Sequence, residues 1–337
     1  MQNNIIYDKP FKTFDEQIAI MQSRGIKISN IEKAKKILEY TSYYSIINGY
    51  KNTFLQSPNA DIFIPGTTFE EIYLLYLLDS DISNIILKYI LFIERSFKTK
   101  LSYRIAEGNK VHHSRFLDVK LYKNKKTKKD YEFLKYIKNK CEKPYENTTS
   151  HYYHTTKNHV PPWIVINDIS FNKAIYWYSL LKSKDKDYIV DRFFYPYNFT
   201  IDLNLKKEFL NKSLNLLLEY RNSIAHGNKI FASKIKNVLP KNALLKIINN
   251  IDTTILSEKE YIKGLGQKDL YAVVLAIAIL LDNSIHINSF RFELTVSFQK
   301  YNNILVKNKP LVYILELPIN FSDRLNTLVE YKINNLL

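Results

Sequence analysis

The six residues from Arg221 to His226 are the part of this sequence best suited to chemistry. Arg221, Asn222 and His226 fall near the end of a helix predicted over residues 201–226, directly before Gly227. A guanidinium can stabilise charge on phosphate oxygens, and an imidazole can accept or donate a proton near neutral pH. This pair can cleave a phosphodiester without a metal ion. A neutral imidazole takes the proton of a ribose 2′-hydroxyl, and an imidazolium protonates the leaving 5′-oxygen.

Arg221 is predicted to lie on the apolar face of that helix. Leucines and isoleucines recur at helical spacing along it, and on an ideal wheel Arg221 falls between Leu214 and Leu217. Burying a guanidinium is costly unless an acidic group or a ligand meets it. The alternative to a catalytic role is a structural ion pair or a helix cap.

The geometry of one helix also predicts a second copy of the chain. Arg221 and His226 point about 140° apart on an ideal helix, so a single copy does not readily surround a phosphate. One imidazole is also a poor acid and base at once. Two antiparallel helix ends related by a two-fold axis would bring both pairs to one cleft, which predicts a homodimer with a composite site.

Composition indicates a globular, strongly basic chain. Of its 337 residues, 46% are hydrophobic and only seven are glycine, and the formal net charge is +16. This charge favours anionic partners, with nucleic acid ahead of a membrane surface, although a merely soluble basic surface is the alternative.

The positive charge is densest between Lys120 and Lys143, where ten lysines meet three acidic residues and aromatic residues such as Tyr131 and Tyr136 are interleaved. Ammonium groups follow a phosphate backbone, and aromatic faces can stack on unpaired bases. A solvated loop and helix face is the alternative. The lysines that we predict to contact RNA are Lys120, Lys123, Lys125, Lys126, Lys128, Lys129, Lys135 and Lys138.

A second cluster, His151, His154 and His159, competes as a metal site, because three imidazoles can hold a metal ion. Its surroundings are rich in Thr, Asn and Tyr, so we interpret it as a surface or RNA-contacting loop. We therefore expect no metal and no cofactor. Cys141 is the only cysteine, which excludes an internal disulfide and a multi-thiolate metal site.

No segment of the sequence is expected to enter a membrane. The longest apolar run, Leu270–Leu281, is shorter than the roughly 20 residues that span a bilayer and predicts a core helix instead. The first residues show no basic-then-apolar leader, so a cytoplasmic location is expected.

Helical periodicity runs through nearly the whole chain and predicts an all-α fold. Asn30 can cap a helix that begins at Ile31. Thr68 and Glu71 form a capping-box pattern, and the helix that follows continues to Glu107, either as one long helix or as two with a bend.

The predicted organisation is an N-terminal helical segment over residues 1–66, a helical domain over 67–231 and a mainly helical region over 232–337. The central domain contains the basic insertion near 120–160. Within the last region, Ser289–Val296 fits either a short strand or a helix.

The sequence also resembles a known family, the AbiD/AbiF-like abortive-infection proteins of bacterial defence, within the HEPN ribonuclease superfamily. The resemblance covers about Phe11–Phe231 and rests on four stretches in the expected order, which are Tyr40–Lys51, Ile93–Tyr103, Pro162–Ile166 and Tyr220–Gly227. It implies a HEPN-type helical bundle with additional helical segments at both ends and metal-independent endoribonuclease activity. It further implies catalytic roles for Arg221 and His226, with Asn222 as the polar residue of the motif, and association with structured non-coding RNA.

The function predicted from these observations is an RNA-cleaving effector of phage defence or of a toxin–antitoxin pair. The alternative is a non-catalytic RNA-binding module in which Arg221 and His226 only grip phosphate. A third hypothesis is a helical interaction protein in which the motif is structural.

Overall fold

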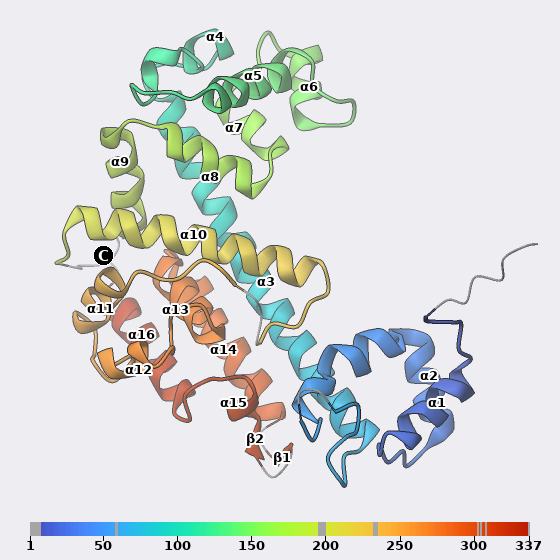
Figure 1. Cartoon of the computed structure of the whole chain (residues 1–337). Coiled ribbons are helices and arrows are strands. Elements are labelled where there is room, and N and C mark those ends of the chain that lie inside the picture. The colour runs from blue at the N-terminus through green and yellow to red at the C-terminus, as the bar shows by residue number, and fades with distance from the viewer. Residues whose placement is uncertain are drawn as a thin grey trace, which may run out of the picture. The chain divides into compact units, whose positions relative to one another are not determined.

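The structure is a computed structural model of the chain. It describes all residues except 1–7, 58–59, 195–199, 232–234, 302, 304, 307–308 and 336–337. The all-α prediction is confirmed (Figure 1). The α-helices are α1 (Phe14–Ser23), α2 (Ile31–Thr41), α3 (Phe69–Ala106), α4 (His113–Phe116), α5 (Lys128–Glu142), α6 (Thr149–Thr156), α7 (Pro162–Val165), α8 (Phe171–Leu180), α9 (Ser183–Phe194), α10 (Leu203–Ala225), α11 (Lys241–Asn249), α12 (Glu258–Ile262), α13 (Leu270–Leu280), α14 (Ser284–Lys300), α15 (Leu311–Ile314) and α16 (Phe321–Asn334).

The remaining elements are short. A π-helical turn, η1 (Tyr44–Asn48), and three 3₁₀ turns join the helices; the 3₁₀ turns are η2 (Lys51–Thr53), η3 (Val119–Leu121) and η4 (Ile166–Asp168). The described strands, β1 (Leu305–Val306) and β2 (Lys309–Pro310), pair antiparallel, with Leu305 opposite Pro310.

The chain divides into two compact units. The first comprises residues 1–83 and 297–315, and the second comprises residues 84–296 and 316–337. Helices α3 and α14 each begin in one unit and end in the other. Helix α10 and the lysine-rich segment Lys120–Lys143 both lie in the second unit.

Helix α3 begins and ends where local sequence signals predict. The amide of Glu71 donates to the Thr68 hydroxyl oxygen at 3.1 Å, and the Thr68 amide donates to the Glu71 carboxylate at 2.9 Å, so the capping box is present. The helix then continues without interruption over 38 residues. Gly108, with φ of +75°, follows its end. The sequence was compatible with one long helix or with two helices and a bend, and the structure has one helix.

Helix α10 lies at the centre of the second unit and packs against α8, α9, α11 and α13 (Figure 1). Helix α13 is buried along its whole length, which confirms the core helix predicted over Leu270–Leu281. Among the residues that the structure describes, no helix combines the length and apolar character needed to cross a bilayer. The segment Ser289–Val296 is helical and belongs to α14.

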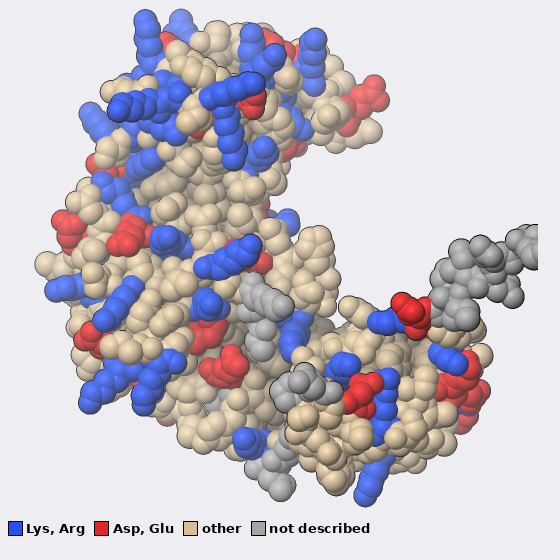
Figure 2. Space-filling model, in the orientation of Figure 1, with Lys and Arg blue, Asp and Glu red and all other residues tan. Residues whose placement is uncertain are grey.

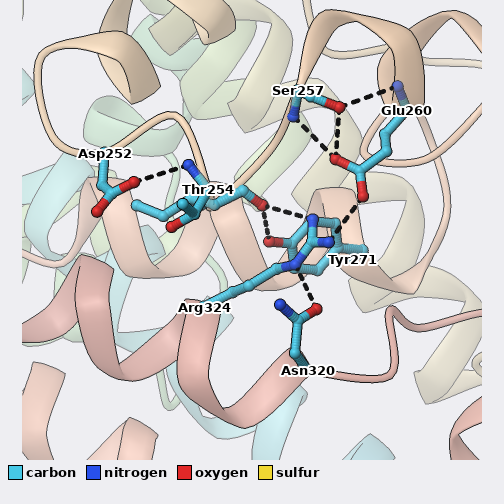
Figure 3. A network of polar contacts seen from close by, with 8 residues as sticks. Asp252, Thr254, Ser257, Glu260, Tyr271, Asn320 and Arg324 are labelled. Atoms are coloured by element: carbon cyan, nitrogen blue, oxygen red, sulfur yellow. Dashed lines mark hydrogen bonds and ion pairs between the residues drawn. The ribbon is translucent and has the colours of Figure 1, made fainter.

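A polar network ties α12, α13 and α16 together (Figure 3). Arg324 donates to the Glu260 carboxylate at 2.7 Å, to the Asn320 side-chain oxygen at 2.7 Å and to the Ile255 carbonyl at 3.1 Å. The Tyr271 hydroxyl donates to the same carbonyl. The hydrogen bond from Arg324 lowers the pKa of Glu260 to about 2, so this ion pair persists at neutral pH.

A further helix, α16, caps α13 with a buried lysine. The Lys332 side chain is fully buried, and its Nζ donates to the carbonyls of Ala278, Ile279 and Leu281 at 2.6, 2.8 and 2.7 Å. These carbonyls belong to the C-terminal end of α13, where helix carbonyls lack intrahelical partners. Lys332 therefore supplies a tertiary cap to the central core helix.

Candidate active site and basic surface

Helix α10 begins at Leu203, where Asp202 caps it by accepting from the Asn204 amide at 2.8 Å. The helix predicted over residues 201–226 is thus confirmed, and in the structure it runs from Leu203 to Ala225. Its buried face runs from Phe209 to Tyr220. The Tyr220 hydroxyl donates to the Lys268 carbonyl at 3.0 Å, and Tyr220 is the last residue of α10 held in the core.

The end of α10 is a Schellman motif. The Gly227 amide donates to the Ile224 carbonyl at 2.9 Å, and the Asn228 amide donates to the Ser223 carbonyl at 3.0 Å. Gly227 has φ of +71°, a conformation that glycine adopts without the strain that a Cβ would bring. The motif fixes His226 as the last residue before the chain turns away.

Arg221 does not lie in the core, so the prediction of a buried guanidinium is wrong. The side chain is half-buried, and its Nη1 donates to the Asn222 Oδ1 at 3.2 Å. In the described part of the chain, no carboxylate lies within ion-pair distance of Arg221. The reason is that burial along α10 ends at Tyr220, and even the apolar Ile224 is only half-buried.

His226 is exposed at the same helix end, and its ring has no hydrogen-bond partner among the described residues. Asn222, one turn before His226, is exposed as well. The structure thus places a guanidinium, a carboxamide and an imidazole within the last two turns of one helix, all accessible to solvent. Such a set can receive an anionic ligand without first breaking an internal ion pair.

A carboxylate next to this group has a structural role. Glu219 accepts from the backbone amides of Lys236 and Asn237, at 2.9 and 3.1 Å. This ties the chain that follows the helix end back to α10. Glu219 therefore holds the segment beyond Gly227 in place and does not form an ion pair with Arg221.

The lysine-rich segment forms η3, a connecting loop and α5. Figure 2 shows Lys and Arg side chains gathered over the part of the second unit that holds α4, α5 and α6. Of the lysines predicted to contact RNA, two pair with acids, Lys123 with Asp130 at 3.0 Å and Lys138 with Glu142 at 3.6 Å. Lys126 is half-buried. The predicted lysines that are exposed and form no described ion pair are Lys120, Lys125, Lys128, Lys129 and Lys135.

Lys128 and Lys129 occupy the first turn of α5, where the helix dipole is positive. Cations at this end are unfavourable, because helix N-termini favour negative charge. Two exposed ammonium groups at this helix start form a locally positive surface beside the buried Asp130 carboxylate. An anionic partner would relieve this repulsion.

Asp130 anchors the same helix start. It is only 2% exposed, caps α5 together with Thr127, and accepts from the Tyr176 hydroxyl at 2.6 Å. Burial acts to raise the pKa of Asp130, but hydrogen bonds from Tyr176, Thr127 and Lys123 outweigh it and hold this pKa well below its usual range. The carboxylate therefore stays charged and fixes α5 against α8.

The histidine cluster differs from its predicted form. His151 and His154 lie on helix α6 rather than in a loop, because Thr148 caps the helix by accepting from the His151 amide at 3.2 Å. The His154 ring hydrogen-bonds the Cys141 carbonyl at 3.1 Å, and the His159 ring hydrogen-bonds Asn158 at 2.6 Å. Within the described residues, no three ligand-type side chains converge to hold a metal ion.

Comparison with known proteins places this chain in a family. The model of the Abi-like protein family matches residues 36–232, more than half of the sequence and including both α10 and the lysine-rich segment. The chain belongs to the Abi-like protein family. Membership supports a role in abortive infection, the bacterial defence after which the family is named. No curated protein and no solved structure gave a significant match.

Proposed function

We propose that this Abi-like protein is a metal-independent endoribonuclease that acts as an effector of abortive infection or of a toxin–antitoxin pair. The observation that carries the proposal is the end of α10, where the half-buried Arg221 and the exposed His226 form no ion pair with a described carboxylate. The family match includes this helix end.

In the proposed reaction, His226 removes the proton of a ribose 2′-hydroxyl, and that oxygen attacks the adjacent phosphorus. The bond to the 5′-oxygen breaks, and an imidazolium returns a proton to this leaving group. Arg221 stabilises the charge that develops on the non-bridging oxygens. Asn222, which accepts from Arg221 at 3.2 Å, acts as a positioning residue for the guanidinium.

The proposal includes a homodimer with a composite site. The half-buried Ile224 extends the apolar face of α10 past the point where the core covers it, beside Arg221. Pairing two such ends about a two-fold axis would cover this residue and would place two imidazoles, one acid and one base, at a single phosphate.

Mixing variants tests the composite site. Arg221→Ala and His226→Ala chains should each lose most of the activity. After unfolding and refolding together they should recover part of it, because random pairing makes about half of the dimers mixed and a mixed dimer holds one imidazole and one guanidinium in its cleft. RNA cleavage of the mixture is compared with that of each variant alone. A wild-type protein that stays monomeric in light scattering, with and without RNA, and still cleaves at full rate contradicts the dimer.

The lysine-rich surface supports an RNA partner, either a structured non-coding RNA or the target. It also favours the second candidate function, an RNA-binding module without catalysis, since Lys128 and Lys129 create an anion-attracting surface apart from Arg221. Expression in bacteria separates the two functions. If the wild type arrests growth and the folded Arg221→Ala, His226→Ala double variant does not, catalysis is supported. Arrest by both indicates binding alone.

A further inference from the structure

Helices α5 and α8 enclose a groove that the lysine pattern of the sequence did not reveal. Its volume is about 320 Å³, at the small end of ligand sites. One wall comes from α5 and the other from α8. The lining residues are Lys129, Glu132, Phe133, Tyr136, Asn172, Lys173 and Tyr176.

Three of the residues that line this groove are aromatic, Phe133, Tyr136 and Tyr176. The Phe133 and Tyr176 ring centroids are 5.0 Å apart in an edge-to-face contact, and the Phe133 and Tyr136 centroids are 6.2 Å apart. Tyr176 is held in place because its hydroxyl donates to the buried Asp130. Phe133 is buried, whereas Tyr136 and Tyr176 remain partly exposed, so both tyrosines can offer a ring face to a ligand.

Flexible cations cover these ring faces. Lys173 Nζ lies 5.1 Å from the Tyr136 centroid, and Lys129 Nζ lies 5.1 Å from the Tyr176 centroid. Both lysines are exposed. A lysine arm can rotate away from a ring and retain its charge, so an incoming planar group could take the ring face while the ammonium group moves to an adjacent anion.

We propose that this groove binds one unpaired nucleotide of a single-stranded RNA segment, with the base stacked on Tyr136 and the flanking phosphates held by Lys129 and Lys173. This inference rests on the proposed RNA partner and specifies its form. A base can enter the groove only if it is not stacked inside a duplex, and stacking on tyrosine tolerates every base because each has a π-face. Lys129, Lys173 and the nearby Lys128 outnumber Glu132, the one acidic lining residue, so the rim attracts phosphate.

The test compares two substitutions at one ring. Tyr136→Leu removes the aromatic face, and Tyr136→Phe keeps it. Binding of a short oligo-A, which is single-stranded, and of a duplex of equal length is measured by fluorescence anisotropy. Tyr136→Leu should weaken binding of oligo-A by about 5- to 100-fold, the usual contribution of one stacked base. Tyr136→Phe should stay within about twofold, and binding of the duplex should not change with either variant.

Two further variants show whether a loss of binding is specific to the groove. Tyr40→Leu, at a tyrosine that is 90% exposed on α2, is the matched control and should leave binding unchanged. Lys173→Gln, on the exposed rim, should weaken oligo-A binding and reduce the slope of log affinity against log salt by about one. Equal losses for oligo-A and duplex, or full oligo-A binding by both Tyr136→Leu and Lys173→Gln, overturn the groove proposal. A wild type that binds neither RNA contradicts the proposed function itself.

Discussion

Replacing His226 with Ala should lower the rate of RNA cleavage by about a hundredfold to ten-thousandfold. This range is typical for the loss of a general acid or base, and a dimeric site would lose both copies. Arg221→Ala should cost about a hundredfold to a thousandfold, the usual effect of removing one donor to a developing oxyanion. The measurement is cleavage of a labelled RNA under single-turnover conditions, with the purified variants compared at equal concentration.

The structure offers a close control for this experiment. Asn228, two residues beyond His226, is exposed, and its backbone amide closes the Schellman motif. Asn228→Ala keeps that amide and should cleave at the wild-type rate. Because the His226 ring has no hydrogen-bond partner among the described residues, His226→Ala should also unfold at the wild-type temperature. Activity that disappears with EDTA and returns with a divalent cation would contradict the metal-independent reaction.

Replacing Lys332 with Met should lower the free energy of unfolding by about 2–4 kcal/mol, because three buried carbonyls at the end of α13 lose their donor. Burial lowers the pKa of Lys332, and the nearby Asp282 carboxylate opposes this shift. The three carbonyl acceptors match the three N–H bonds of an ammonium group. Met has nearly the same length and leaves the packing in place, so the loss reports on the polar cap.

Urea denaturation followed by circular dichroism measures this effect. Lys246→Met on α11, where the lysine is exposed, is the matched control and should change stability by no more than about 0.5 kcal/mol. A Lys332→Met protein that is as stable as the wild type would mean that desolvating the ammonium group costs as much as its hydrogen bonds contribute.

Features set by neighbouring residues could be predicted from the sequence. The capping box of Thr68 and Glu71, the cap at Asn30 and the glycine stop at Gly227 are each completed within a few residues, so local sequence contains the whole interaction. The apolar stretch of α13 and the helical period of α10 likewise predicted these two helices from the sequence. The Arg221-to-His226 motif was found in the same way, since its members share one helix end.

Features set by distant residues were decided only by the tertiary structure. Whether Arg221 is buried depends on where the partners of α10 stop, and a helical wheel contains no information about them. The groove joins Tyr136 on α5 to Lys173 on α8, and the cap of α13 comes from Lys332, more than fifty residues further along the chain. Residues 297–315 likewise join the first unit although they lie near the end of the sequence. Helical periodicity shows which face of an element is apolar, whereas the partner that covers this face is selected by packing across the whole chain.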